Sequence, residues 1–182
     1  KEISGAQRGT LYHLVMEHFP YQEIKESEKV WEATDYEKYF SEMAKKGYMT
    51  EQECRVLDGR KFVQFMETSI GQRMAAAHET GTLRLEQPFM IGENAKDIFV
   101  GISSEEMIMV QGIIDAFFFD GENIVLVDYK TDAVPSGNGQ ELAKKYQAQL
   151  DQYAMALERL TGKKVSEKII YSFTLGIEIP LS

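Results

Sequence analysis

The chain has 182 residues, 43% of them hydrophobic, and a net charge of -9. This length and composition predict a single domain with a sizeable core and exclude a disordered linker. One cysteine, Cys54, excludes an internal disulfide framework, a four-cysteine zinc site and a cysteine-ligated iron-sulfur cluster within this chain. The acidic charge predicts weak intrinsic nucleic-acid binding, because that affinity comes mainly from Lys and Arg neutralising phosphates.

No apolar run approaches the roughly 18 residues of a membrane span, and the N-terminus lacks a basic segment leading into a hydrophobic one. We therefore expect a soluble protein of a reducing compartment, without a membrane partner. The sequence begins at Lys1 rather than at a methionine, which favours a fragment of a longer protein.

The first 80 residues have helical patterns. Residues 8–19 have an apolar side that predicts a helix, whereas the charged stretch 20–33 predicts a loop or irregular turn. Thr34 or Asp35 is expected to cap a second helix, which Gly47 would end.

Two further helices are expected before the strands begin. The sequence TEQE at 50–53 matches a capping box that opens a short helix, and residues 58–68 predict another amphipathic helix. We expect segment 20–80 to be a helical insertion or lid within one domain that covers 1–182.

From Thr82 onward the patterns are mainly those of strands. The clearest are 82–91, 107–119 and 123–130, which are rich in β-branched, aromatic and aliphatic residues. Residues 139–162 predict the longest helix, and 167–179 a last strand or pair of strands.

The segment VQGIIDAFFFDGENIVLVDYKTDAV, residues 110–134, predicts a hairpin with acidic residues inside its strands. If Gly121 and Glu122 form the loop, Asp115 lies opposite Asp128. If the loop is one residue earlier, Asp115 lies one diagonal step from Asp128. Lys130 shares their face in both registers, because side chains alternate with period 2. A three-residue loop would break this arrangement.

Two carboxylates facing each other in an apolar sheet repel, which raises the pKa of one of them unless a cation lies between them. Oxygen ligands without cysteine fit Mg2+ or Mn2+, which could serve phosphodiester hydrolysis with Lys130 as an electrostatic partner. The structural alternative is a buried salt bridge of Lys130 with Asp115 and Asp128.

Gln149 and Tyr153 lie one turn apart beside the apolar stripe of the 139–162 helix. An amide and a phenol in this position can hydrogen-bond a phosphate or stack on a base. In the alternative interpretation Tyr153 is a core residue and Gln149 an interfacial hydrogen-bonding group.

Five sequence blocks, in this order, resemble the RecB-type nuclease family of the PD-(D/E)XK superfamily. Within it the chain is most similar to the C-terminal nuclease domains of the AddA type of helicase-nuclease, over residues 5 to 175. The blocks are GTLYH (9–13), EQPF (86–89), GIIDAFF (112–118), VDYKTD (127–132) and QLDQY (149–153). The resemblance implies an α/β, restriction-endonuclease-like core with a central mixed sheet flanked by helices, and an extra N-terminal helical segment.

The resemblance also implies a metal site. It makes His13 a ligand beside Asp115 and Asp128, with the backbone carbonyl of Tyr129 completing the site around Mg2+ or Mn2+. The branches of the family that bind an iron-sulfur cluster carry several cysteines, so the composition points away from them and no iron-sulfur cluster is expected.

Further roles follow from the same resemblance. Lys130 matches the catalytic lysine of the family, which makes Asp115, Asp128 and Lys130 the catalytic set. Gln149 and Tyr153 match its substrate-side pair. For Glu86 two roles stay open: a carboxylate that orients the first helix, or a water-bridged metal contact.

The function implied is that of a Mg2+-dependent deoxyribonuclease, an exonuclease in double-strand break repair and recombination. Its substrate would be single-stranded DNA from an unwound duplex, delivered by a helicase motor in the same parent chain, with an AddB-like subunit, in the bacterial cytoplasm. The alternatives are a stand-alone phage or RecE-like exonuclease, and an inactive nuclease fold that binds DNA or acts as a scaffold.

Overall fold

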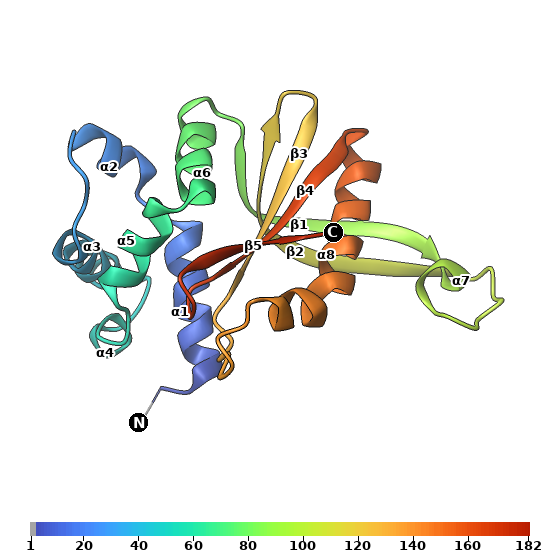
Figure 1. The fold of residues 1–182 in the computed structure, drawn as a ribbon, viewed down its shortest axis with the longest axis horizontal. Coiled ribbons are helices and arrows are strands. Elements are labelled where there is room, and N and C mark those ends of the chain that lie inside the picture. The colour runs from blue at the N-terminus through green and yellow to red at the C-terminus, as the bar shows by residue number, and fades with distance from the viewer. Residues whose placement is uncertain (1–2) are drawn as a thin grey trace.

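A five-stranded sheet with helices on both faces forms the centre of the molecule, as the computed structural model of residues 3–182 shows (Figure 1). The strand order is β1-β2-β3-β4-β5; β3 and β4 are parallel and the other neighbours antiparallel. This confirms the predicted α/β fold with a mixed sheet. The strands are β1 (Leu83–Asn94), β2 (Met107–Asp120), β3 (Asn123–Lys130), β4 (Lys164–Ser172) and β5 (Ile177–Leu181).

Six helices precede the sheet: α1 (Gly5–Glu17), α2 (Tyr21–Glu26), α3 (Ala33–Lys45), α4 (Glu51–Cys54), α5 (Gly59–Glu67) and α6 (Ser69–Glu79). The capping box at Thr50 is confirmed, with Glu53 as its partner. The loop predicted for 20–33 was wrong in part, because α2 forms there. The N-cap of α3 is Glu32, whose backbone N–H donates to Asp35, so the N-caps predicted at Thr34 or Asp35 were wrong. The predicted end at Gly47 is confirmed: this glycine follows the C-cap Lys46 and has a φ of 84°.

Two helices lie within the β-rich part of the chain. The predicted long helix is α8 (Gln140–Thr161), which ends at Gly162 in the left-handed conformation. It connects the parallel strands β3 and β4. The sequence patterns did not predict α6 or the short α7 (Ala95–Ile98) between β1 and β2.

The sheet separates two apolar cores. On one face, α1 to α6 enclose a cluster rich in aromatic rings, including Tyr12, Phe62 and Phe173. On the other face, α8 buries Leu150 and Leu157 against Ile114 and Leu126. Figure 1 shows these two helical layers on opposite sides of the strands.

The turn between β2 and β3 sets the register of the hairpin. Asp120 pairs with Asn123, and Gly121 has a φ of 59° that suits a glycine in a two-residue loop. The last partners in the β2–β3 ladder are Ala116 and Val127, and one position further along the two strands Asp115 lies opposite Asp128. The first of the two predicted registers is therefore the one that forms.

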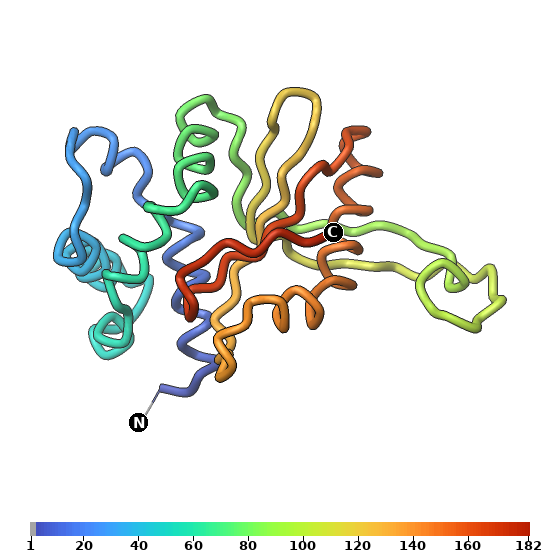
Figure 2. Tube along the Cα trace, viewed as in Figure 1, coloured from blue at the N-terminus to red at the C-terminus, as the bar shows by residue number. Residues whose placement is uncertain are grey.

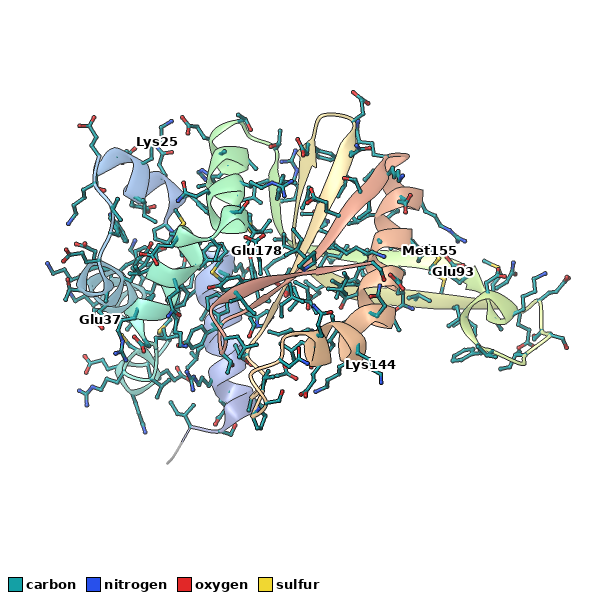
Figure 3. The ribbon with its side chains drawn as sticks, in the orientation of Figure 1. Lys25, Glu37, Glu93, Lys144, Met155 and Glu178 are labelled. Atoms are coloured by element: carbon teal, nitrogen blue, oxygen red, sulfur yellow. The ribbon has the colours of Figure 1, made fainter. Side chains whose placement is uncertain are left out.

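Beyond the sheet, β1 and β2 continue as a two-stranded arm that ends in α7 (Figure 2). One face of the arm packs on α8, where Arg159 pairs with the buried Glu93. Figure 3 shows Glu93 on this arm and Met155 on the neighbouring α8. The arm also exposes apolar side chains: Met90, Met107, Met109 and Ile113.

No helix among residues 3–182 combines the length and apolar character needed to cross a bilayer.

Candidate active site

Helix α1 brings His13 to the sheet. Its side chain reaches strand β2, where Nε2 lies 3.1 Å from Asp115 Oδ2. On the other side of the ring, Nδ1 lies 3.0 Å from the carbonyl oxygen of Gly9, one turn earlier in the helix. Because a carbonyl only accepts, Nδ1 carries a proton in this contact, and Nε2 is the atom that faces the sheet.

Gly9 allows α1 to approach the end of β3. A Cβ atom at this position would lie only 2.8 Å from Thr131 Oγ1. The glycine thus has two functions in the GTLYH block: its missing side chain permits the close approach, and its carbonyl orients the histidine ring. The helix itself begins with a capping box between Ser4 and Gln7.

Asp115 is buried and lies at the centre of these contacts. Its Oδ2 accepts hydrogen bonds from His13 and from the backbone N–H of Tyr129, the latter at 2.9 Å. Burial by itself raises the pKa of Asp115, but the hydrogen bond and charge of His13, with smaller effects of Tyr129 and Asp128, hold that pKa below its usual value. Asp115 is therefore ionised at neutral pH.

The pKa of His13 changes in the opposite direction. Burial by itself lowers the pKa of the ring, but the hydrogen bond and charge of Asp115 outweigh burial and raise the pKa to about 9. In the metal-free protein, His13 is therefore a cation at neutral pH, and both ring nitrogens donate.

Asp128, on β3, is the more deeply buried carboxyl group, with 3% of its surface exposed. Burial, and then the charge of Asp115, raise its pKa to about 7 in spite of the nearby Lys130. Lys130 Nζ lies 2.8 Å from Asp128 Oδ2, an ion-pair distance at which the angles of a hydrogen bond are not met. Asp128 Oδ2 is thus a buried oxygen that is paired with the charge of Lys130 but accepts no hydrogen bond.

Lys130 is held between β3 and α8. Its Nζ donates to Gln149 Oε1 at 2.9 Å and lies 3.9 Å from the centre of the Tyr146 ring. Gln149 Nε2 in turn donates to the Tyr153 hydroxyl at 3.3 Å. The pair predicted on this helix thus faces the carboxylates, and Gln149 is linked directly to the lysine.

Glu86, on β1, lies opposite Asp115 on β2. In the β1–β2 ladder, Leu85 is the partner of Ala116 and Gln87 is the partner of Ile114, which leaves this position between them. Its φ of 48° lies in the left-handed region, which is strained for a residue other than glycine. Burial raises the pKa of Glu86, and the charge of Asp115 raises it further. A third carboxyl group therefore lies within electrostatic reach of the two aspartates.

The carboxylate and imidazole groups of the site are ligand types that a hard divalent cation binds. In this structure, however, these groups are paired with one another or with Lys130. No three His, Cys, Asp or Glu side chains of residues 3–182 form a ready-made metal cage. His13 and Asp115 face each other, and Asp128 faces Lys130. The buried Oδ2 of Asp128, which accepts no hydrogen bond, lies near an ionised Asp115, and a cation would stabilise two such carboxyl groups.

The chain matches the PD-(D/E)XK nuclease superfamily over residues 1–178. The chain belongs to this superfamily. Its members share the kind of mixed sheet with flanking helices found here, which confirms the resemblance seen in the sequence.

Three bacterial relatives of this superfamily member are named as the A subunit of an ATP-dependent helicase/nuclease. The protein of Alkaliphilus metalliredigens is 37% identical over 175 residues, which cover 95% of this chain. Those of Lachnoclostridium phytofermentans and Clostridioides difficile are 33% and 36% identical over 98% and 95% of this chain. The chain spans only 14% or 15% of the length of these relatives.

The structure brings the predicted side chains of this nuclease-superfamily chain together around Asp115 and Asp128, and Tyr129 contributes its backbone N–H there. Sequence patterns did not single out Gly9, Asp132 or Tyr146. Tyr146 has the spacing of a core residue in α8, and only the fold shows that its ring lies against Lys130. For Gly9 a signal was present, because the spacing Gly-x-x-x-His places the histidine over the glycine carbonyl of the preceding turn.

Proposed function

We propose that this chain is the nuclease domain of a helicase-nuclease and hydrolyses DNA phosphodiester bonds with Mg2+ or Mn2+. The observation that carries the proposal is the opposition of Asp115 and Asp128, with Lys130 Nζ 2.8 Å from Asp128 Oδ2. A fold that needed only a stable hairpin would gain nothing from two repelling carboxylates in its buried strands. The relatives' shared name supports a nuclease.

The metal would be held by His13, Asp115, Asp128 and the backbone carbonyl of Tyr129. When bound, it would polarise the scissile phosphate and lower the pKa of the attacking water. The protein contributes the positions of the ligands: Gly9 orients the His13 ring, and the Tyr129 N–H holds Asp115. His13 must give up its proton before Nε2 can act as a ligand.

Lys130 and α8 would act on the substrate. Nζ carries a positive charge next to the carboxylates, where it can stabilise the charge that develops on the phosphate or orient the attacking water. Gln149 and Tyr153 lie on the same side and offer an amide and a hydroxyl to the DNA strand. Glu86 would contribute to the metal site through its negative charge.

The substrate we propose is single-stranded DNA that the helicase motor of the same parent chain unwinds, in an exonuclease step of double-strand break repair and recombination. The net charge of -9 gives the domain little affinity of its own for DNA, and tethering to a motor would raise the local strand concentration. An AddB-like subunit would be the partner, in the bacterial cytoplasm. Segment 20–80, whose helices pack beside α1, would be the lid of a single domain.

The direct experiment is cleavage of end-labelled single-stranded DNA with Mg2+ or Mn2+, with EDTA as a control. We expect Asp128→Ala and Lys130→Ala to abolish cleavage, while Glu122→Ala and Lys163→Ala, an ion pair at the turn end of the β2–β3 hairpin, retain it. A circular single strand separates the two modes of cutting, because an exonuclease needs an end. Cleavage that survives EDTA or either site substitution would refute the proposal.

Thermal unfolding tests the metal site apart from cleavage. Mn2+ should raise the melting temperature of the wild-type chain, and Asp128→Ala should remove that increase, because only a ligand that binds the folded state stabilises it. A chain that neither cuts nor gains stability from Mn2+ would have the fold of a nuclease without its function.

A further inference from the structure

The ring of Tyr146 covers the side of Lys130 that faces α8. The Nζ atom lies 3.9 Å from the ring centre, within the range of a cation–π contact, and 14% of the Lys130 side chain is exposed. With Asp128 and Gln149, the ring surrounds the ammonium group on three sides. Tyr146 is not among the site residues expected from the sequence.

Tyr146 is itself fixed by Asp132. Its hydroxyl donates to Asp132 Oδ2 at 2.7 Å, and Lys145 Nζ donates to the same oxygen at 2.8 Å. Asp132 follows Lys130 by two residues in the segment after β3. The ring is therefore tied at its far end to the chain that carries the lysine, and it cannot turn away without breaking this bond.

Two carboxylates compete for Lys130. Asp128 precedes it by two residues and Asp132 follows it by two, and the charge of Lys130 is felt by both. A lysine has a flexible four-carbon chain with many rotamers, so it needs contacts to select one position. Tyr146 and Lys145 occupy Asp132, which leaves the ammonium group of Lys130 to Asp128 and Gln149.

We propose that Tyr146 is a positioning residue for Lys130: its ring and its bond to Asp132 hold the ammonium group at Asp128, beside the reacting phosphate. This inference rests on the proposed function, in which Lys130 acts on the substrate. Tyr146 contacts the lysine and not the metal ligands, so its loss should affect the chemical step and leave metal binding intact.

The position of Lys130 is measurable without any cleavage. In protein carrying 13C-labelled lysine, the Cε protons of Lys130 should be shifted upfield by the tyrosine ring, and the signal is assigned by its absence in Lys130→Ala. Tyr146→Leu should remove the shift, whereas Tyr146→Phe, which keeps the ring but loses its bond to Asp132, should retain part of it. An unshifted Lys130 signal in the wild-type chain would overturn the inference whether or not the chain is a nuclease.

Cleavage kinetics then test the consequence. Tyr146→Leu should lower kcat roughly 3- to 30-fold, the range that a cation–π contact supports, with KM and Mn2+ affinity changed less than about twofold. Tyr146→Phe should lose less of kcat than Tyr146→Leu, because it keeps the ring and loses only the bond to Asp132. Parallel losses of kcat and Mn2+ affinity in Tyr146→Leu would show a merely structural role, and an unchanged kcat would also overturn the inference.

The two proposals fail in different ways. If Lys130→Ala cuts as fast as the wild-type chain, the catalytic role of Lys130 is wrong, although the NMR shift still reports the contact. If Lys130→Ala is inactive and Tyr146→Leu is fully active, only the positioning role of Tyr146 is wrong.

Discussion

His13 Nε2 and Asp115 Oδ2 lie 3.1 Å apart although 102 positions separate them in the chain. This contact joins the first helix to the second strand, and it sets the charge of both groups. The carboxylate makes the ring a cation, and the cation keeps the carboxylate ionised. In the proposed metal site the same two atoms would be ligands, so metal and proton would compete for them.

The first prediction concerns this competition. His13, with a pKa of about 9, and Asp128, with a pKa of about 7, must both lose a proton before they can be ligands. Mn2+ affinity should therefore rise steadily from about pH 6 to about pH 8.5. Calorimetry in buffers of different ionisation enthalpy should detect released protons. Affinity that is independent of pH would show that these groups are not ligands.

The second prediction concerns the stability of the metal-free chain. The pKa of Asp128 is 3.8 for the isolated group and about 7 in the fold, so the fold favours the protonated form. The resulting stabilisation is complete below the unfolded pKa and is lost as the pH rises through about 7. Asp128→Asn imitates the protonated carboxyl group. We compare the unfolding free energy of Asp128→Asn with that of the wild type at two pH values. The advantage of Asp128→Asn should be larger at about pH 8 than at about pH 4.5, by a few kcal/mol.

Urea denaturation in the presence of a chelator measures this difference. Asp97→Asn, which changes an exposed carboxylate on α7, is the control for the substitution itself. Equal pH dependence in Asp128→Asn and the wild-type chain would contradict the raised pKa of Asp128.

The third prediction concerns the close contact of α1 with the end of β3. Gly9→Ala places a Cβ atom 2.8 Å from Thr131 Oγ1, so one of the two must move. Gly5→Ala lies in the same helix with nothing within 4 Å and is the control for helix propensity. We expect Gly9→Ala to be less stable than Gly5→Ala by about 1 kcal/mol or more.

A second substitution identifies the cause of that loss. Thr131→Ala removes the hydroxyl group that the new methyl group would meet, so the pair Gly9→Ala with Thr131→Ala should recover part of the stability in urea denaturation. If the double variant is no more stable than the sum of the single variants predicts, the contact with Thr131 is not the reason.

Much of the site could be predicted because its residues lie in short, regular patterns. Asp115, Asp128 and Lys130 share a face as soon as a strand period and a two-residue turn are assumed, and Gly121 makes that turn. The metal role proposed for His13 came only from the family resemblance, since nothing local to a helix shows which strand it will meet.

The remaining features depend on contacts between distant segments. The left-handed conformation of Glu86 arises inside a strand, at a residue that is neither Gly nor Asn, so no turn signal marks it. Helix α2 forms in a charged stretch because Tyr21 is buried in the helical layer, where its ring lies 4.7 Å from that of Phe19. Tertiary packing overrides local propensity in both cases.

The last prediction uses two glutamates that share one backbone conformation. Glu86 and Glu28 are the two non-glycine residues of positive φ among residues 3–182, at 48° and 53°. Glycine adopts this conformation without steric cost, so Glu86→Gly and Glu28→Gly should each raise the free energy of unfolding by up to about 1 kcal/mol. Only Glu86 lies beside Asp115, so only Glu86→Gly should weaken Mn2+ binding, by several-fold. Urea denaturation and Mn2+ titration of both variants separate the two effects: equal Mn2+ affinity in them would mean that Glu86 bends the strand but contributes nothing to the metal site.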